Sequence, residues 1–160
     1  MSRLAELSEM ERQSWATLIA DGLLFTWFWK TMAPGWSLIP RDLDPAQLSS
    51  VFIKLVILTI VVHAVIAAVF SFRRNRDEVE LDERDLDAQA FGSRVAYTAM
   101  YLGVGAITLA ALSGYILPEA VTTPFRIETM VHVIFALVLL SYAADLLRNA
   151  AMLLRYDRAV

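Results

Sequence analysis

The chain has 160 residues, of which 58% are hydrophobic and 19% are charged, and its mean hydropathy is +0.53. Such values require the charges to be gathered between apolar segments, which is typical of a multi-pass membrane protein and leaves little room for a soluble catalytic domain. The absence of cysteine excludes disulfides and thiolate chemistry, and a net charge of only −3 gives no electrostatic basis for binding nucleic acid.

Four apolar segments each have about the 20 residues with which a helix crosses a bilayer. They cover approximately residues 15–34, 51–72, 95–117 and 129–147. We therefore expect residues 1–160 to form a single domain, an all-α integral membrane protein built as a four-helix bundle. Acidic residues precede the first segment and no small-residue cleavage site follows it, so we expect this helix to be retained rather than removed as a signal peptide.

The basic residues lie mainly on one side of the predicted membrane. If the four spans alternate in direction, both termini and the loop 73–94 share the side with more lysine and arginine, which the positive-inside rule assigns to the cytoplasm. The residues on that side are Arg3, Arg12, Arg73, Arg74, Arg76, Arg84, Arg94, Arg148, Arg155 and Arg158, and those on the other are Lys30, Arg41, Lys54 and Arg126.

Two helices have recognisable start signals. Asp44 precedes Pro45, which is typical of an N-cap followed by proline in the first helical turn. Asp82, Glu83 and Asp85 precede the third apolar segment, where negative charge favours the positive end of a helix, and we expect Asp82 to be the N-cap. The third helix should therefore begin in the cytoplasm. A divalent-cation site in this acidic run is the less favoured interpretation.

The end of the fourth apolar segment is amphipathic. Asp145, Arg148 and Asn149 alternate with leucines and a methionine, which predicts a helix that continues into the cytoplasm. In the third segment, small residues recur three or four positions apart, and such a stripe lets a second helix approach closely. We favour packing within the bundle, and homo-oligomers through the third helix are the alternative. The stripe consists of Ala99, Gly103, Ala106, Ala110 and Gly114.

Asp21 is the most costly residue of the predicted spans. It lies about 9 Å from the inner end of its helix, where an ionised carboxylate needs a partner, a proton or water. Arg94 and Asp145 should lie near the same depth, so we predict a polar network of these three residues in which Asp21 pairs with Arg94. The network is either a structural tie between helices or part of a proton or cation pathway.

Both histidines fall within predicted spans. At 1.5 Å per residue, His63 lies roughly 18 Å below the outer edge but His132 only about 5 Å, so ligation of one haem by both is disfavoured. Glu128 and His132 are four residues apart, on one side of a helix, and we expect them to pair with each other or with Lys54. The sequence offers too few further ligands for a metal site.

Three segments of the sequence are similar to a known family: ERQSW, LDERDLDAQAFGSRVAY and LLRNAAMLLRYDR. Together they resemble uncharacterised small four-helix proteins of the bacterial inner membrane with a DERD-type cytoplasmic loop. The resemblance implies four spans in that membrane and no particular activity. Asp157, between Tyr156 and Arg158, departs from the basic end of the family pattern. The matching positions are Glu11, Trp15, Asp82, Glu83, Arg84, Asp85, Tyr97, Arg148 and Tyr156.

The sequence favours a function without catalysis, because it contains no motif for nucleophilic, metalloprotease or phosphate-binding chemistry. The family-like residues lie mainly on the cytoplasmic side. We therefore expect an accessory or regulatory subunit that sits in membrane lipid and binds a protein partner through its cytoplasmic loop and tail, without a cofactor. A small proton- or ion-coupled transporter that uses Asp21 is the alternative, and a haem-binding redox protein is less favoured.

Overall fold

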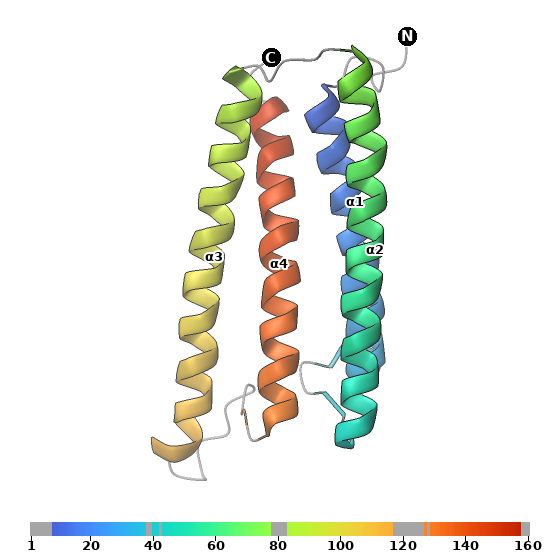
Figure 1. The fold of residues 1–160 in the computed structure, drawn as a ribbon. Helices are drawn as coiled ribbons and strands as arrows, with labels where there is room; N and C mark the ends of the chain where they lie inside the picture. The colour runs from blue at the N-terminus through green and yellow to red at the C-terminus, as the bar shows by residue number, and fades with distance from the viewer. Residues whose placement is uncertain are drawn as a thin grey trace.

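The chain folds as a row of long antiparallel helices (Figure 1). The computed structural model describes residues 8–37, 40, 41, 43–77, 83–116, 127 and 129–157. Within these residues the predicted all-α class is confirmed, and the helices alternate in direction along the chain. They are α1 (Glu9–Met32), the short 3-10 helix η2 (Pro34–Trp36), α2 (Pro45–Asp77), α3 (Glu83–Ile116) and α4 (Met130–Asp157).

Among the described residues, three helices are long and apolar enough to cross a membrane: Ala46–Ser71, Glu83–Ser113 and Met130–Asp157. The first helix, α1, has 24 residues and is long enough for the same purpose. It is less apolar because it carries Asp21, Lys30 and several polar or indole side chains.

Local signals fix the starts of α1 and α2. The Ser8 side chain caps α1 by accepting a hydrogen bond of 3.1 Å from the backbone N–H of Glu11. Asp44 caps α2 in the same way, because its carboxylate accepts a 2.8 Å bond from the N–H of Gln47. The predicted N-cap with Pro45 behind it is therefore confirmed. The predicted N-cap of α3, Asp82, lies outside the described residues.

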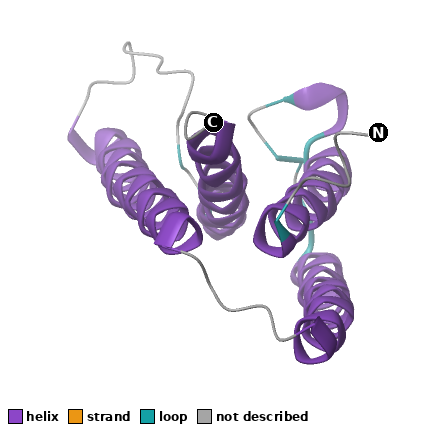
Figure 2. Cartoon of the chain, turned by 90° about the horizontal axis from the view of Figure 1, so that it is seen from above, coloured by secondary structure: helices purple, strands orange, loops and turns teal. Residues whose placement is uncertain are grey.

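The helix α4 lies between α1 and α3, and α2 packs against α1 to one side of this line, where its Thr59 also bonds to Tyr142 of α4 (Figure 2). Consequently α2 and α3 occupy the two ends of the row, and each leaves much of its apolar surface uncovered. Ile60 on α2 is 62% exposed and Leu109 on α3 is 70% exposed. Surfaces of this composition need lipid or another apolar surface to cover them.

A compact apolar core joins α1, α2 and α4 near the η2 end of α1. Phe28 of α1 and Phe135 of α4 are almost fully buried and stack with ring centroids 5.8 Å apart. Leu24 and Leu55 extend this core to the neighbouring turn of α1 and to α2. The core fixes the rotation of α1 and so directs Asp21, one turn before Leu24, into the space between the helices.

The interface between α3 and α4 depends on close approach at glycines. A Cβ atom at Gly103 would lie 2.2 Å from a methyl group of Leu140, so this member of the predicted small-residue stripe packs within the chain. At Gly92 the contact involves the backbone of α4, because a Cβ atom would lie 2.7 Å from the backbone oxygen of Arg148. A backbone atom yields less than a side chain, so Gly92 sets the separation of the helices.

Replacement of Gly92 by alanine should therefore separate α3 from α4 and lower the free energy of unfolding by about 1–3 kcal/mol. The matched control is Gly105→Ala in the same helix, because a Cβ atom there meets nothing within 4 Å. Thermal unfolding in detergent, followed by circular dichroism, checks this difference. Equal midpoints for the two variants would contradict it.

Candidate functional site

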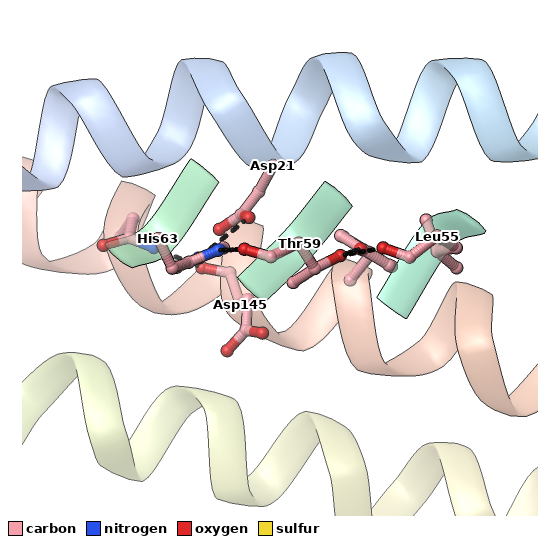
Figure 3. A network of polar contacts seen from close by, with 7 residues as sticks. Asp21, Leu55, Thr59, His63 and Asp145 are labelled. Atoms are coloured by element: carbon pink, nitrogen blue, oxygen red, sulfur yellow. Dashed lines mark hydrogen bonds and ion pairs between the residues drawn. The ribbon is translucent and has the colours of Figure 1, made fainter. Parts of the chain in front are cut away.

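Asp21 of α1, which is buried, pairs with the partly exposed His63 of α2 between the helices (Figure 3). Asp21 is only 1% exposed, and its Oδ1 lies 3.2 Å from Nε2 of His63. The second ring nitrogen, Nδ1, lies 2.9 Å from the backbone oxygen of Thr59, one turn earlier in α2. Both nitrogens of His63 are therefore engaged in contacts within the protein.

The hydrogen bonds of His63 determine how many protons the pair holds. A backbone carbonyl can only accept, so Nδ1 must carry a proton in order to bond to Thr59. A second proton must lie between Nε2 and Oδ1, because two lone pairs at that distance would repel each other. The pair is then either imidazolium with carboxylate or imidazole with carboxylic acid, and both forms have zero net charge. Because the pair is neutral, the burial of Asp21 among apolar side chains costs less free energy than the burial of a lone carboxylate.

The predicted pairing of Asp21 with Arg94 is wrong. Arg94 is exposed on α3, and Oδ2 of Asp21 has no hydrogen-bond partner among the described residues. The physical reason is the order of the helices: α4 separates α1 from α3. The predicted depths did indicate His63 as a partner. With His63 roughly 18 Å from the outer edge and Asp21 about 9 Å from the inner edge, the two residues lie at nearly the same depth in a membrane core about 30 Å thick.

A second polar link, between Thr59 of α2 and Tyr142 of α4, adjoins the pair. The hydroxyl of Thr59 donates a 2.8 Å bond to the backbone oxygen of Leu55, so the hydroxyl of Tyr142 must be the donor in its own bond to Thr59 Oγ1. The sequence analysis missed both residues. The signal for Thr59 is that Leu55, Thr59 and His63 are spaced by four and share one face of α2. This spacing gives no signal for Tyr142, which belongs to α4.

Two cavities meet at the Asp21–His63 pair. The first has a volume of about 430 Å³, opens toward the start of α1 and the end of α4, and has largely polar walls. The second has a volume of about 310 Å³, lies toward η2, and has largely apolar walls. Both are lined by Asp21, His63 and Asp145. The polar cavity adds Gln13, Ser14, Thr17, Gln89, Arg148 and Asn149, and the apolar cavity adds Phe52, Leu55, Val56 and Val138.

The structure thus brings Asp21 and Asp145 of the predicted network to one place, without Arg94. Within the described part of the chain, the Asp145 carboxylate makes no hydrogen bond or ion pair, although its backbone oxygen accepts one from Asn149. Arg148 lines the polar cavity one turn further along α4, and its buried Nε has no partner either. The exposed Asp145 carboxylate and the buried Nε of Arg148 therefore line one polar cavity, and neither bonds to another described side chain.

The predicted cytoplasmic motif forms a joint between three helix ends. Asp85 is buried and accepts hydrogen bonds from Tyr156 Oη at 2.6 Å and Ser8 Oγ at 3.3 Å. Arg84 donates to the Tyr156 backbone oxygen at 2.6 Å and lies over its ring. Glu83 is exposed, and Asp82 lies outside the described residues.

Tyr156 lies beyond the predicted fourth span, which ends near residue 147. Burial raises the pKa of its hydroxyl, as do the hydrogen bond and charge of Asp85. The hydroxyl therefore stays protonated and remains the donor that satisfies Asp85. This contact holds the start of α3 against the end of α4.

The second histidine has a local role at the start of α4. The backbone N–H of Thr129 donates a 3.2 Å bond to Nδ1 of His132, which satisfies a donor at the helix end. Glu128, its predicted partner, lies outside the described residues. Across the described residues, no group of three or more His, Asp or Glu side chains is arranged to hold a metal ion.

Comparison of the chain with protein-family models, with curated proteins and with solved structures finds no match. The family resemblance seen in the sequence therefore stays a prediction, and the site is interpreted from its own chemistry.

His63→Ala should leave the buried carboxyl of Asp21 without its partner and lower the free energy of unfolding by about 1–3 kcal/mol, a value reduced because the imidazole is partly exposed. Arg94→Ala should change it by less than about 0.5 kcal/mol, as for an ordinary surface residue. The double variant with Asp21→Asn and His63→Ala should regain part of the loss. Chemical unfolding in detergent measures the free energy of unfolding of all three variants. A loss for Arg94→Ala as large as that for His63→Ala would contradict His63 as the partner of Asp21 and favour Arg94.

Proposed function

We propose that this chain is a small proton- or cation-coupled transporter of the bacterial inner membrane, in which the Asp21–His63 pair is the ion-binding centre. The observation that carries the proposal is a buried carboxyl group paired with a partly exposed imidazole. It faces a polar cavity through an oxygen that has no hydrogen-bond partner among the described residues. Ionisable groups at this depth of a membrane protein commonly mark ion pathways.

Location in a membrane is supported by the three long apolar helices and by the exposed apolar side chains of α2 and α3. We infer that α1 is a fourth span, because its length suffices and its one intramembrane acid faces the other helices instead of lipid. Both termini are then cytoplasmic by the positive-inside rule, and the polar cavity opens toward the cytoplasm.

The hydrogen bonds suggest that protons enter from one side in this conformation. On the side of the pair toward η2, the hydrogen bonds end at the backbone oxygens of Thr59 and Leu55. These oxygens only accept hydrogen bonds and have no proton to transfer further. The unpartnered Oδ2 of Asp21 and the Asp145 carboxylate offer a path on the polar side instead. A proton taken up there gives the pair a charge of about +1, and a proton lost gives about −1.

This charge change would act on the relative positions of the helices. Asp21 belongs to α1 and His63 to α2, so their contact is part of what holds α2 in place. A change in its protonation alters that contact and gives a means of coupling ion binding to movement of α2. Movement of this kind is what alternating access requires.

The accessory-subunit hypothesis becomes the second candidate. It depended on the motif at residues 82–85 being presented to a partner, whereas the side chains of Arg84 and Asp85 are used in contacts within the chain. Among the described residues of this motif, Glu83 and Arg84 are exposed, and Arg84 is used in contacts with Tyr156.

The transporter proposal predicts a proton-dependent charge movement even without substrate. On a solid-supported membrane, a rapid drop in pH should produce a transient current in the wild-type protein as protons enter the buried site, and Asp21→Asn should remove it. Asp87→Asn is the control, because this exposed carboxylate pairs with Arg155 outside the site. A current that persists in Asp21→Asn would contradict the proposal.

A further inference from the structure

The polar cavity contains charged groups of both signs that the described part of the protein leaves uncompensated. Oδ2 of Asp21, in a side chain only 1% exposed, has no hydrogen-bond partner, and neither has the buried Nε of Arg148. Asp145, whose side chain is exposed, lines the same cavity. The buried Oδ2 of Asp21 and Nε of Arg148 cost free energy while they lack partners among the described residues, and a ligand that bonds to them would supply the missing hydrogen bonds.

The charges are separated along the axis of the cavity. Asp21, Asp145 and His63 line both cavities, whereas Arg148, one turn further toward the end of α4, lines the polar cavity and not the apolar one. Three residues of α-helix correspond to an axial rise of about 4.5 Å, so the acids and the guanidinium belong to successive turns of the cavity wall. Gln13 and Thr17 add neutral polar groups around them.

The balance of charge decides between classes of ligand. The Asp21–His63 pair is neutral with its shared proton, so Asp145 and Arg148 contribute one charge of each sign. A simple cation would leave Arg148 unpaired, and a simple anion would leave Asp145 unpaired. A zwitterion satisfies both, with its ammonium group on the acids and its anionic group on the guanidinium, a donor well suited to carboxylate and phosphate.

The adjoining apolar cavity indicates what else the ligand carries. It shares Asp21, His63 and Asp145 with the polar cavity and continues between Phe52, Leu55 and Val138. An apolar group carried by the ligand would therefore enter it. With volumes of about 430 and 310 Å³, the two spaces together are in the range of small-molecule sites.

We propose that this site binds a zwitterion with an apolar substituent, in which an ammonium group and a carboxylate or phosphate are a few bonds apart. The inference rests on the proposed transport function and names its substrate class. Two sources share this chemistry: a free amino acid with an apolar side chain, and the ethanolamine headgroup of a phospholipid.

The test is binding to the purified full chain in detergent, measured by isothermal titration calorimetry with three related probes. Leucine carries both charges, 3-methylbutylamine lacks the carboxylate, and 4-methylpentanoate lacks the ammonium. Glycerophosphoethanolamine, titrated in parallel, reports a lipid headgroup. We expect leucine or glycerophosphoethanolamine to bind, and the tighter of the two identifies the source. For the amino-acid source, leucine should bind at least about tenfold more tightly than either single-charge analogue.

Variants assign the two ends of the ligand. Arg148→Gln should abolish the preference for leucine over 3-methylbutylamine, and Asp145→Asn should abolish the preference over 4-methylpentanoate. Arg155→Gln, at an exposed arginine paired with Asp87, should leave both preferences intact. If a variant fails to fold, the comparison of probes on the wild-type protein decides alone.

Equal binding of 3-methylbutylamine and leucine would overturn the proposal, as would the failure of both leucine and glycerophosphoethanolamine to bind. If the pH-induced current of the wild-type protein persists in either case, the proton site stands and only the zwitterion assignment fails. Loss of that current in the wild-type protein would instead remove the transport function.

Discussion

The shared proton between Asp21 and His63 is the interaction on which the centre of this protein depends. A carboxylate among apolar helices needs a neutralising partner, and the imidazole provides one only in the orientation that its bond to the Thr59 carbonyl imposes. Thr59 in turn accepts the hydroxyl of Tyr142. Asp21 of α1 thus determines polar contacts of α2 and α4, and these contacts fix the position of α2.

Two further regions hold α1 so that this pair can form. Toward η2, the stacked rings of Phe28 and Phe135 hold α1 against α4. At the opposite end, Ser8 and Tyr156 both donate to Asp85, which joins the start of α1, the start of α3 and the end of α4. The family-like acidic motif therefore has a structural purpose in this chain. It joins the helices at the end where the polar cavity opens.

The helices were predictable from the sequence because they depend on local signals. Apolar length located all four, and the cap of α2 at Asp44 followed from its neighbour Pro45. The need of Asp21 for a partner was also predictable, because the cost of burying a carboxylate is independent of the fold. The identity of that partner was not, because it depends on which helices are neighbours. Depth along a helix places His63 and Arg94 near Asp21 alike, and only the position of α4 between α1 and α3 decides between them.

Residues of ordinary type were the hardest to anticipate. Thr59 and Tyr142 stand in apolar helices as single polar residues, and nothing in their spacing distinguishes a buried link from a residue bonded to its own helix backbone. Arg148 was predicted only as part of an amphipathic surface and a family pattern. Its Nε is instead buried without a partner at a cavity that also holds two acids. Such convergence of opposite charges arises from three-dimensional packing, which a linear pattern does not encode.

Nitrogen-15 NMR of the imidazole rings tests the shared proton most directly, because the chain contains only two histidines and a His132→Gln sample assigns them. The account predicts that His63 carries a hydrogen-bonded proton on Nδ1 and that its Nε2 resonance shifts in Asp21→Asn but not in Arg94→Ala. A proton on Nε2 alone, or a His63 spectrum that Asp21→Asn leaves unchanged, would contradict the account.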